Sequence, residues 1–131
     1  MMPCKWLDHA IRDLQAARIL LENGLCGESA FHSQQAAEKA LKAILAALGT
    51  QPPKTHQLEY LMVLAERKGI DTREIRNASI LTDYAVEARY PDFEDEPSCN
   101  EAAEAVKLAG KVLEWARRTL EEKGIECLTP G

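Results

Sequence analysis

The chain has 131 residues, a length that suits one domain with a sizeable core and is too short for two. Its apolar fraction of 46% and charged fraction of 28% are ordinary for a globular protein and argue against wholesale disorder. The net charge of −5 argues against a surface that binds nucleic acid all over, because such binding needs many Lys and Arg contacts with phosphate. One local basic site is still compatible with this charge.

The cysteines show no zinc-binding pattern. Cys4, Cys26, Cys99 and Cys127 form no Cys-x-x-Cys pair, and no histidine lies at zinc-finger spacing from them. The first dozen residues are charged and amphipathic, unlike a secretory leader, and no stretch approaches the ~18 apolar residues that span a bilayer. These features predict a cytoplasmic protein with free or buried thiols, no metal and no membrane contact.

The first half of the chain predicts two long helices. Apolar residues recur at 4-4-3-4 spacing over 5–22, and the helix stops before Gly24. The second helix, 27–48, is rich in alanine and ends at Gly49, a residue type that commonly follows a helix. Pro52 prevents its continuation.

Three more helices are predicted in the second half. A short one covers 56–67, and a fourth begins at Asp71, where Glu74 would complete a capping box. Ser98 and Glu101 form a second capping box before the last helix. Its apolar positions from 102 to 120 follow a 4-3-4-3-4 series that is typical of a packed seam.

The fold class that these elements predict is all-α. No window alternates with period two, so no strand is expected. Short connections between the helices favour an antiparallel up-and-down helical bundle of four to five helices. We expect a single domain over 1–124 and a flexible C-terminal tail over 125–131.

One carboxylate lies on an apolar helix face. Asp13 shares the buried stripe of the first helix with Trp6, Ala10 and Ala17. A carboxylate in that position needs a partner, since its desolvation is otherwise costly. It therefore either forms a structural ion pair or hydrogen bond inside the bundle or belongs to a polar site between helices.

The second helix carries a polar stripe. His32, Gln35, Lys39 and Lys42 are spaced 3-4-3 and fall on one face. Glu38 lies four residues before Lys42, the favourable order for a helical ion pair. Such a stripe is either a solvated face or a surface that meets an anionic ligand or a partner.

The densest polar cluster follows the fourth predicted helix. Arg89 offers a planar donor fork that suits phosphate or carboxylate, and Tyr90 adds a stacking face. Pro91 biases Tyr90 away from helical geometry. The alternative is a turn in which Arg89 pairs with neighbouring acids such as Asp92. Those acids lack the alternation and the glycine of a calcium loop.

No recognised catalytic or cofactor-binding motif is present. His9, His32 and His56 are the only imidazoles, and none completes a Glu-x-x-His metal motif. Gly-rich phosphate loops and nucleophile elbows are absent, so no cofactor is expected. His56 is expected to help close the N-terminus of the third helix.

Four motifs together resemble one family. They are Asp13-Leu14 on the first helix, PheHisSerGlnGlnAlaAlaGluLysAlaLeuLysAla at 31–43, ThrHisGlnLeu at 55–58 and AlaArgTyrProAsp at 88–92. In this order and spacing the chain resembles the HEPN (higher eukaryotes and prokaryotes nucleotide-binding) family over 5–122. The resemblance implies a helical bundle, often a homodimer, that works with a minimal nucleotidyltransferase in a two-component, toxin–antitoxin-like pair.

The resemblance leaves three functions open. Some HEPN branches are metal-independent endoribonucleases with an Arg-x(4–6)-His motif, which this chain lacks. The leading expectation is therefore a non-catalytic subunit that binds a nucleotide or a nucleotidyltransferase, with Arg89, Lys39 and Lys42 on phosphate, Tyr90 stacking, and Asp92 or Asp13 orienting Arg89. The second is a ribonuclease toxin with an altered site, in which His32 or His56 joins Arg89. The third is a structural module that dimerises through the seam at 102–120.

Overall fold

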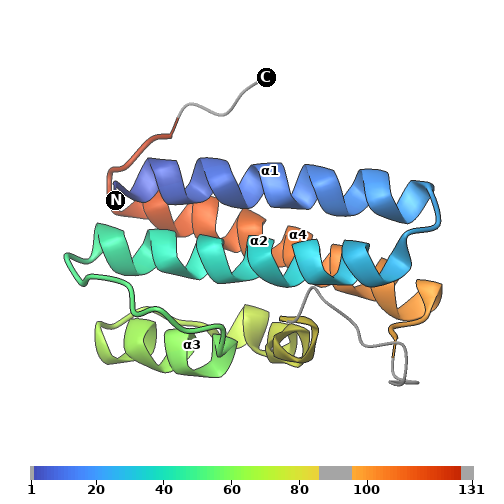
Figure 1. The fold of residues 1–131 in the computed structure, drawn as a ribbon. Helices are drawn as coiled ribbons and strands as arrows, with labels where there is room; N and C mark the ends of the chain where they lie inside the picture. The colour runs from blue at the N-terminus through green and yellow to red at the C-terminus, as the bar shows by residue number, and fades with distance from the viewer. Residues whose placement is uncertain (1, 86–95, 128–131) are drawn as a thin grey trace.

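Five helices make up the computed structural model, which describes residues 2–85 and 96–127. They are α1 (Pro3–Glu22), α2 (Cys26–Ala47), α3 (Leu58–Arg67), η1 (Arg73–Tyr84) and α4 (Cys99–Glu122). α1, α2 and α4 are long and lie side by side. The shorter α3 and η1 follow one another along the other side of α2 (Figure 1). The described residues contain no strand, so the predicted all-α up-and-down bundle is confirmed.

α2 is the central element and contacts each of the other four. Its small side chains let neighbouring helices pack closely around it on several sides. The alanines at its centre are fully buried: Ala30, Ala36, Ala37, Ala40 and Ala43. Leu41, Ile44 and Leu45 supply the bulk of its contribution to the core. Within the described part of the chain, no helix is long and apolar enough to cross a membrane.

Two predicted helix ends that capping residues mark are confirmed. Gly49 has a φ of 77°, and the amide of Thr50 donates to the carbonyl oxygen of Leu45 at 3.0 Å, which closes the end of α2. At the start of α4, the amide of Glu101 donates to Ser98 Oγ and the amide of Ser98 donates to Glu101 Oε1, both at 3.0 Å. The predicted Ser98–Glu101 capping box is therefore confirmed.

The fourth helix differs from its prediction in type and in its start. η1 is a 3-10 helix of 12 residues whose N-cap residue, Thr72, makes no side-chain capping bond. The buried Ile75, Ala78 and Leu81 are spaced by three, the repeat of a 3-10 helix. The Asp71–Glu74 capping box is wrong: Asp71 bonds Arg73, and the Glu74 carboxylate pairs with an arginine of α4.

The apolar seam of α4 faces the chain's own core. Ala102, Ala109, Ala116 and Leu120 are fully or almost fully buried, and Leu113 is nearly so. They belong to the same core cluster as the apolar residues of α1 and α2. These seam residues therefore pack within the bundle, and Val106, the remaining position of the seam, is partly buried.

All four cysteines are paired in disulfides. Cys4 bonds Cys127 with a Cα–Cα distance of 5.3 Å, and Cys26 bonds Cys99 with one of 5.1 Å. The prediction of free thiols is wrong, because the bundle brings together cysteines that are 123 and 73 residues apart. Of the expected tail, the structure describes 125–127, where Ile125 packs against the core.

Candidate functional site

The polar stripe of α2 faces its neighbours and is not a solvated surface. The side chains of Glu38 and Lys42 are only 5% and 8% exposed, and those of His32 and Lys39 only 28% and 25%. α2 lies between α1 on one side and α3 and η1 on the other, so side chains of this stripe can contact residues on both sides of α2. Its polar contacts are made to two carboxylates, Asp13 of α1 and Glu38 of α2.

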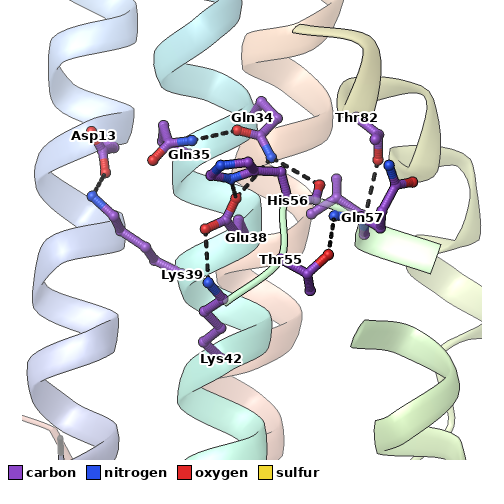
Figure 2. A network of polar contacts seen from close by, with 11 residues as sticks. Asp13, Gln34, Gln35, Glu38, Lys39, Lys42, Thr55, His56, Gln57 and Thr82 are labelled. Carbon is purple, nitrogen blue, oxygen red and sulfur yellow. Dashed lines mark hydrogen bonds and ion pairs between the residues drawn. The ribbon is translucent and has the colours of Figure 1, made fainter. Parts of the chain in front are cut away.

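Asp13 of α1 forms the first centre. Its Oδ1 lies 2.9 Å from His32 Nδ1, and its Oδ2 accepts a 2.6 Å hydrogen bond from Lys39 Nζ. Because a carboxylate only accepts, His32 donates through Nδ1. The prediction that Asp13 finds a partner inside the bundle is confirmed, and these contacts join α1 to α2 (Figure 2).

Glu38 of α2 forms the second centre, which is almost fully buried. Its Oε1 lies 2.7 Å from His56 Nδ1 and accepts a 3.1 Å bond from Gln34 Nε2. Its Oε2 accepts a 3.0 Å bond from Lys42 Nζ, as the i,i+4 spacing predicted. Three donors surround the carboxylate, which satisfies its acceptors and offsets its desolvation (Figure 2).

A side-chain amide extends the second centre. Gln34 Nε2 also donates to the backbone oxygen of His56 at 3.3 Å, and Gln34 Oε1 accepts a 2.6 Å bond from Gln35 Nε2. The loop before α3 is thus held at both the ring and the backbone of His56. The sequence argument did not single out Gln34, although its spacing of four from Glu38 was a usable signal.

Lys42 also contacts an aromatic ring of α1. Its Nζ lies 5.6 Å from the ring centroid of Trp6, within the range of a cation–π interaction. The indole Nε1 of Trp6 is buried and has no hydrogen-bond partner among the described residues. The Lys42 ammonium therefore lies between the Trp6 ring and the Glu38 carboxylate.

His56 is the most exposed member of the network. Its side chain is 62% exposed, and its Nδ1 is directed at Glu38. α3 begins at Leu58 with Gln57 as its N-cap residue, so His56 does not close this helix as expected. A neutral imidazole that donates through Nδ1 keeps an acceptor at Nε2, and its protonated form keeps a donor there.

The predicted turn at Arg89, Tyr90 and Asp92 lies outside the described residues. The described residues on either side of 86–95 border α3 and α2. Before the gap, Thr82 Oγ1 accepts a 3.2 Å bond from the amide of Leu58. After the gap, Glu96 lies beside Gly27 at the start of α2.

Comparison with known proteins identifies the family. The HEPN domain model matches residues 4–119, most of the chain. The crystal structure of TT1696 from Thermus thermophilus is 30% identical, with a TM-score of 0.80 over 92% of this chain and 100% of that one. The structure of ST0689, an archaeal HEPN homologue, is 27% identical, with a TM-score of 0.72 over 90% and 97% of the two chains. No curated protein sequence matches this chain.

Proposed function

This chain belongs to the HEPN domain family, and we propose that it is a non-catalytic HEPN subunit that binds a nucleotide, a minimal nucleotidyltransferase partner, or both. The binding face would be the polar side of α2 together with the loop before α3. The observation that carries the proposal is the pair of carboxylates, Asp13 and Glu38, that hold two imidazoles and two ammonium groups in set positions.

Such an arrangement suits a phosphate-bearing ligand because its donors are oriented before the ligand arrives. The ring of His56 is held by Glu38 while most of its surface stays in water. Lys39 gives one of its three N–H groups to Asp13 and keeps two for other acceptors. Groups that are already ordered lose less conformational entropy on binding, which favours affinity.

The buried members of the network have a supporting role in this proposal. Lys42 and Gln34 hold the Glu38 carboxylate, which in turn holds His56. We therefore assign the ligand contacts to His32, Lys39 and His56. Arg89, which the sequence predicts as a phosphate contact, is a further contact in this proposal.

The proposal has two halves, nucleotide binding and partner binding. Titration calorimetry with nucleoside triphosphates tests the nucleotide half. We expect saturable binding that weakens in His56→Ala, Lys39→Ala and Arg89→Ala. Lys111→Ala serves as the matched control, since it removes an exposed lysine of α4 that is outside the network. The absence of heat with all nucleotides, or equal losses in Lys111→Ala, would contradict this half.

Co-expression tests the partner half. The family resemblance implies a minimal nucleotidyltransferase encoded beside the gene for this chain. We expect the two proteins to co-purify at low salt, and the complex to weaken in Lys39→Ala more than in Lys111→Ala. Separate elution of the two proteins at low salt would contradict the partner half and leave the nucleotide half unaffected.

A second candidate function is RNA cleavage, and the Glu38–His56 contact favours it. A buried carboxylate that binds Nδ1 fixes the tautomer of an imidazole, so that Nε2 can accept a proton. In this reaction Nε2 of His56 would take the proton of a ribose 2′-hydroxyl. The 2′-oxygen would then bond to phosphorus, and the 5′-oxygen would leave with a proton from water, giving a 2′,3′-cyclic phosphate.

Cleavage assays distinguish this candidate from the leading one. If the chain is a ribonuclease, His56→Ala should abolish cleavage and Glu38→Gln should weaken it, with no metal ion required. Cleavage that is equal in the wild type and in His56→Ala would point to a contaminating nuclease.

A further inference from the structure

The Cys26–Cys99 disulfide joins the starts of two helices. Cys26 is the first residue of α2 and Cys99 is the first residue of α4. These two helices begin at the same end of the bundle (Figure 1). The bond therefore clamps the chain that enters α4 to the central helix of the fold.

Glu96, just before α4, lies beside the first turn of α2. Pro97 is buried, and Glu96 Oε1 is 3.5 Å from the position that a Cβ on Gly27 would occupy. The disulfide thus holds a short stretch, 96–99, against the first turn of α2. Among the described residues, this stretch has no hydrogen bond or ion pair to α2, so the disulfide is its one covalent link there.

The two bonded cysteines differ in exposure to solvent as residues. Cys99 is an exposed residue, whereas Cys26 is 7% exposed. A thiolate in solution can therefore reach Cys99 more easily than Cys26. Exchange begins with attack on one sulfur, so an approach from the Cys99 side is enough to begin it.

Both helix starts keep other contacts when the bond is absent. The Ser98–Glu101 capping box lies within α4 and does not depend on Cys26. Ala102, one turn into α4, is fully buried in the core. At the start of α2, Ser29 Oγ donates a 2.7 Å hydrogen bond to the carbonyl oxygen of Ala17. Opening the bond therefore removes the covalent restraint on the first turn of α4, which can fray, while Ala102 and the rest of the bundle stay packed.

We propose that Cys26–Cys99 is a reversible redox clamp that a dithiol reductant opens without unfolding the bundle. One thiolate of the reductant bonds to Cys99 Sγ, and Cys26 leaves as a thiolate that takes up a proton. The second thiol of the reductant then displaces Cys99 and gives up its proton. The reductant ends as a disulfide, and the protein ends with two thiols.

The clamp closes again because the fold keeps the two thiols near each other. The core contact at Ala102 holds α4 beside α2, so a disulfide oxidant can restore the bond by the reverse exchange. The other disulfide has a different place, joining Cys4 in the first turn of α1 to Cys127 beyond the end of α4. It provides a matched comparison within the same chain.

Hydrogen exchange on two paired-serine variants tests the clamp. Cys4→Ser with Cys127→Ser leaves only the clamp, and Cys26→Ser with Cys99→Ser leaves only the other bond. Each protein is measured oxidised, after treatment with dithiothreitol, and after reoxidation with glutathione disulfide. Alkylation of free thiols and mass spectrometry report which bond is open.

We expect reduction of the clamp-only protein to speed exchange at the hydrogen-bonded amides of Ser98, Glu101 and Ala102 by about tenfold or more, and reoxidation to reverse this change. Amides 36–45 at the centre of α2 should be unaffected, and Cys26→Ser with Cys99→Ser should exchange like the reduced clamp. Unchanged exchange at these three amides on reduction would overturn the proposal. Unfolding of the whole bundle, either on reduction or in the Cys26→Ser, Cys99→Ser protein, would overturn it as well.

Discussion

The Nδ1 atom of His56 and the Oε1 atom of Glu38 are joined by a 2.7 Å hydrogen bond between the loop before α3 and the centre of α2. The two residues are 18 positions apart, and one is almost fully buried while the other is mostly exposed. This bond connects the interior of the bundle with the surface at which we place the ligand. The stability of the interior network and the position of the surface imidazole should therefore change together.

Replacement of Glu38 by alanine should destabilise the protein strongly. The change leaves the buried ammonium of Lys42 without its carboxylate, and it removes the acceptor of Gln34 and His56. A loss of about 3–5 kcal/mol in the free energy of unfolding is expected. Urea unfolding provides the measurement, with Glu104→Ala as an exposed control that should change stability by less than about 0.5 kcal/mol.

A double substitution separates the buried charge from the rest of this effect. Glu38→Leu combined with Lys42→Met leaves neither charge buried alone, so it should be less destabilising than Glu38→Ala. If the double variant unfolds at a lower urea concentration than Glu38→Ala, packing and not the unpaired ammonium dominates the loss.

Replacement of Asp13 by asparagine should have a smaller effect. The amide keeps one acceptor oxygen, and Lys39, which is partly exposed, can turn toward water. We expect a loss of about 1–2 kcal/mol, and a double-mutant cycle with Lys39→Met should show coupling. The control is Asp8→Asn, since Asp8 is more exposed than Asp13 and its partner at 3.4 Å, Arg12, is 70% exposed. Equal losses of unfolding free energy in the two variants would show that the contacts of Asp13 stabilise the fold no more than a surface ion pair does.

Reduction of both disulfides should lower the melting temperature. The bonds close loops of 73 and 123 residues, and the chain-entropy model gives about 4–5 kcal/mol for each loop of such length. Calorimetry of the oxidised protein and of the two paired-serine variants gives the contribution of each bond. A melting temperature that is the same in all three proteins would mean that the unfolded chain is not constrained by these bonds.

The acid dependence of one surface pair is also predictable. Hydrogen bonds from the side chain and the amide of Arg73 lower the pKa of Asp71 to about 2 from 3.8. A lowered pKa means that the carboxylate favours the folded state at neutral pH. This contribution is present above pH 3.8 and is lost as the pH falls toward about 2.

An NMR titration of the Asp71 carboxyl carbon checks this value. The midpoint should lie near 2 in the wild-type protein and should rise in Arg73→Gln, where the donor group is lost. A wild-type midpoint near 3.8 would indicate that the Asp71–Arg73 hydrogen bonds do not persist in solution.

The helices that sequence predicts well are those with strong periodicity and clear ends. α1, α2 and α4 carry long apolar stripes, and Gly49 and the Ser98–Glu101 box mark two of their boundaries. The 3-10 geometry of η1 was not predicted, because a spacing of three over a short stretch is shared by α-helices and 3-10 helices.

The site was only partly predictable for a related reason. An acid on an apolar stripe, Asp13, and an i,i+4 pair, Glu38–Lys42, are local patterns that point to buried polar contacts. The contact of His56 with Glu38 depends on how the loop before α3 returns to α2, which no local pattern specifies. The two disulfides depend on the same long-range packing.

The Cys4–Cys127 bond turns most of this polypeptide into a covalent ring. A single cut in the backbone between these two residues therefore opens the ring but releases no fragment. If the loop between α2 and α3 is nicked, the α1–α2 and α3–α4 portions stay attached to each other through sulfur. Such a nicked protein should run as one species on a non-reducing gel and as two on a reducing gel once both bridges open.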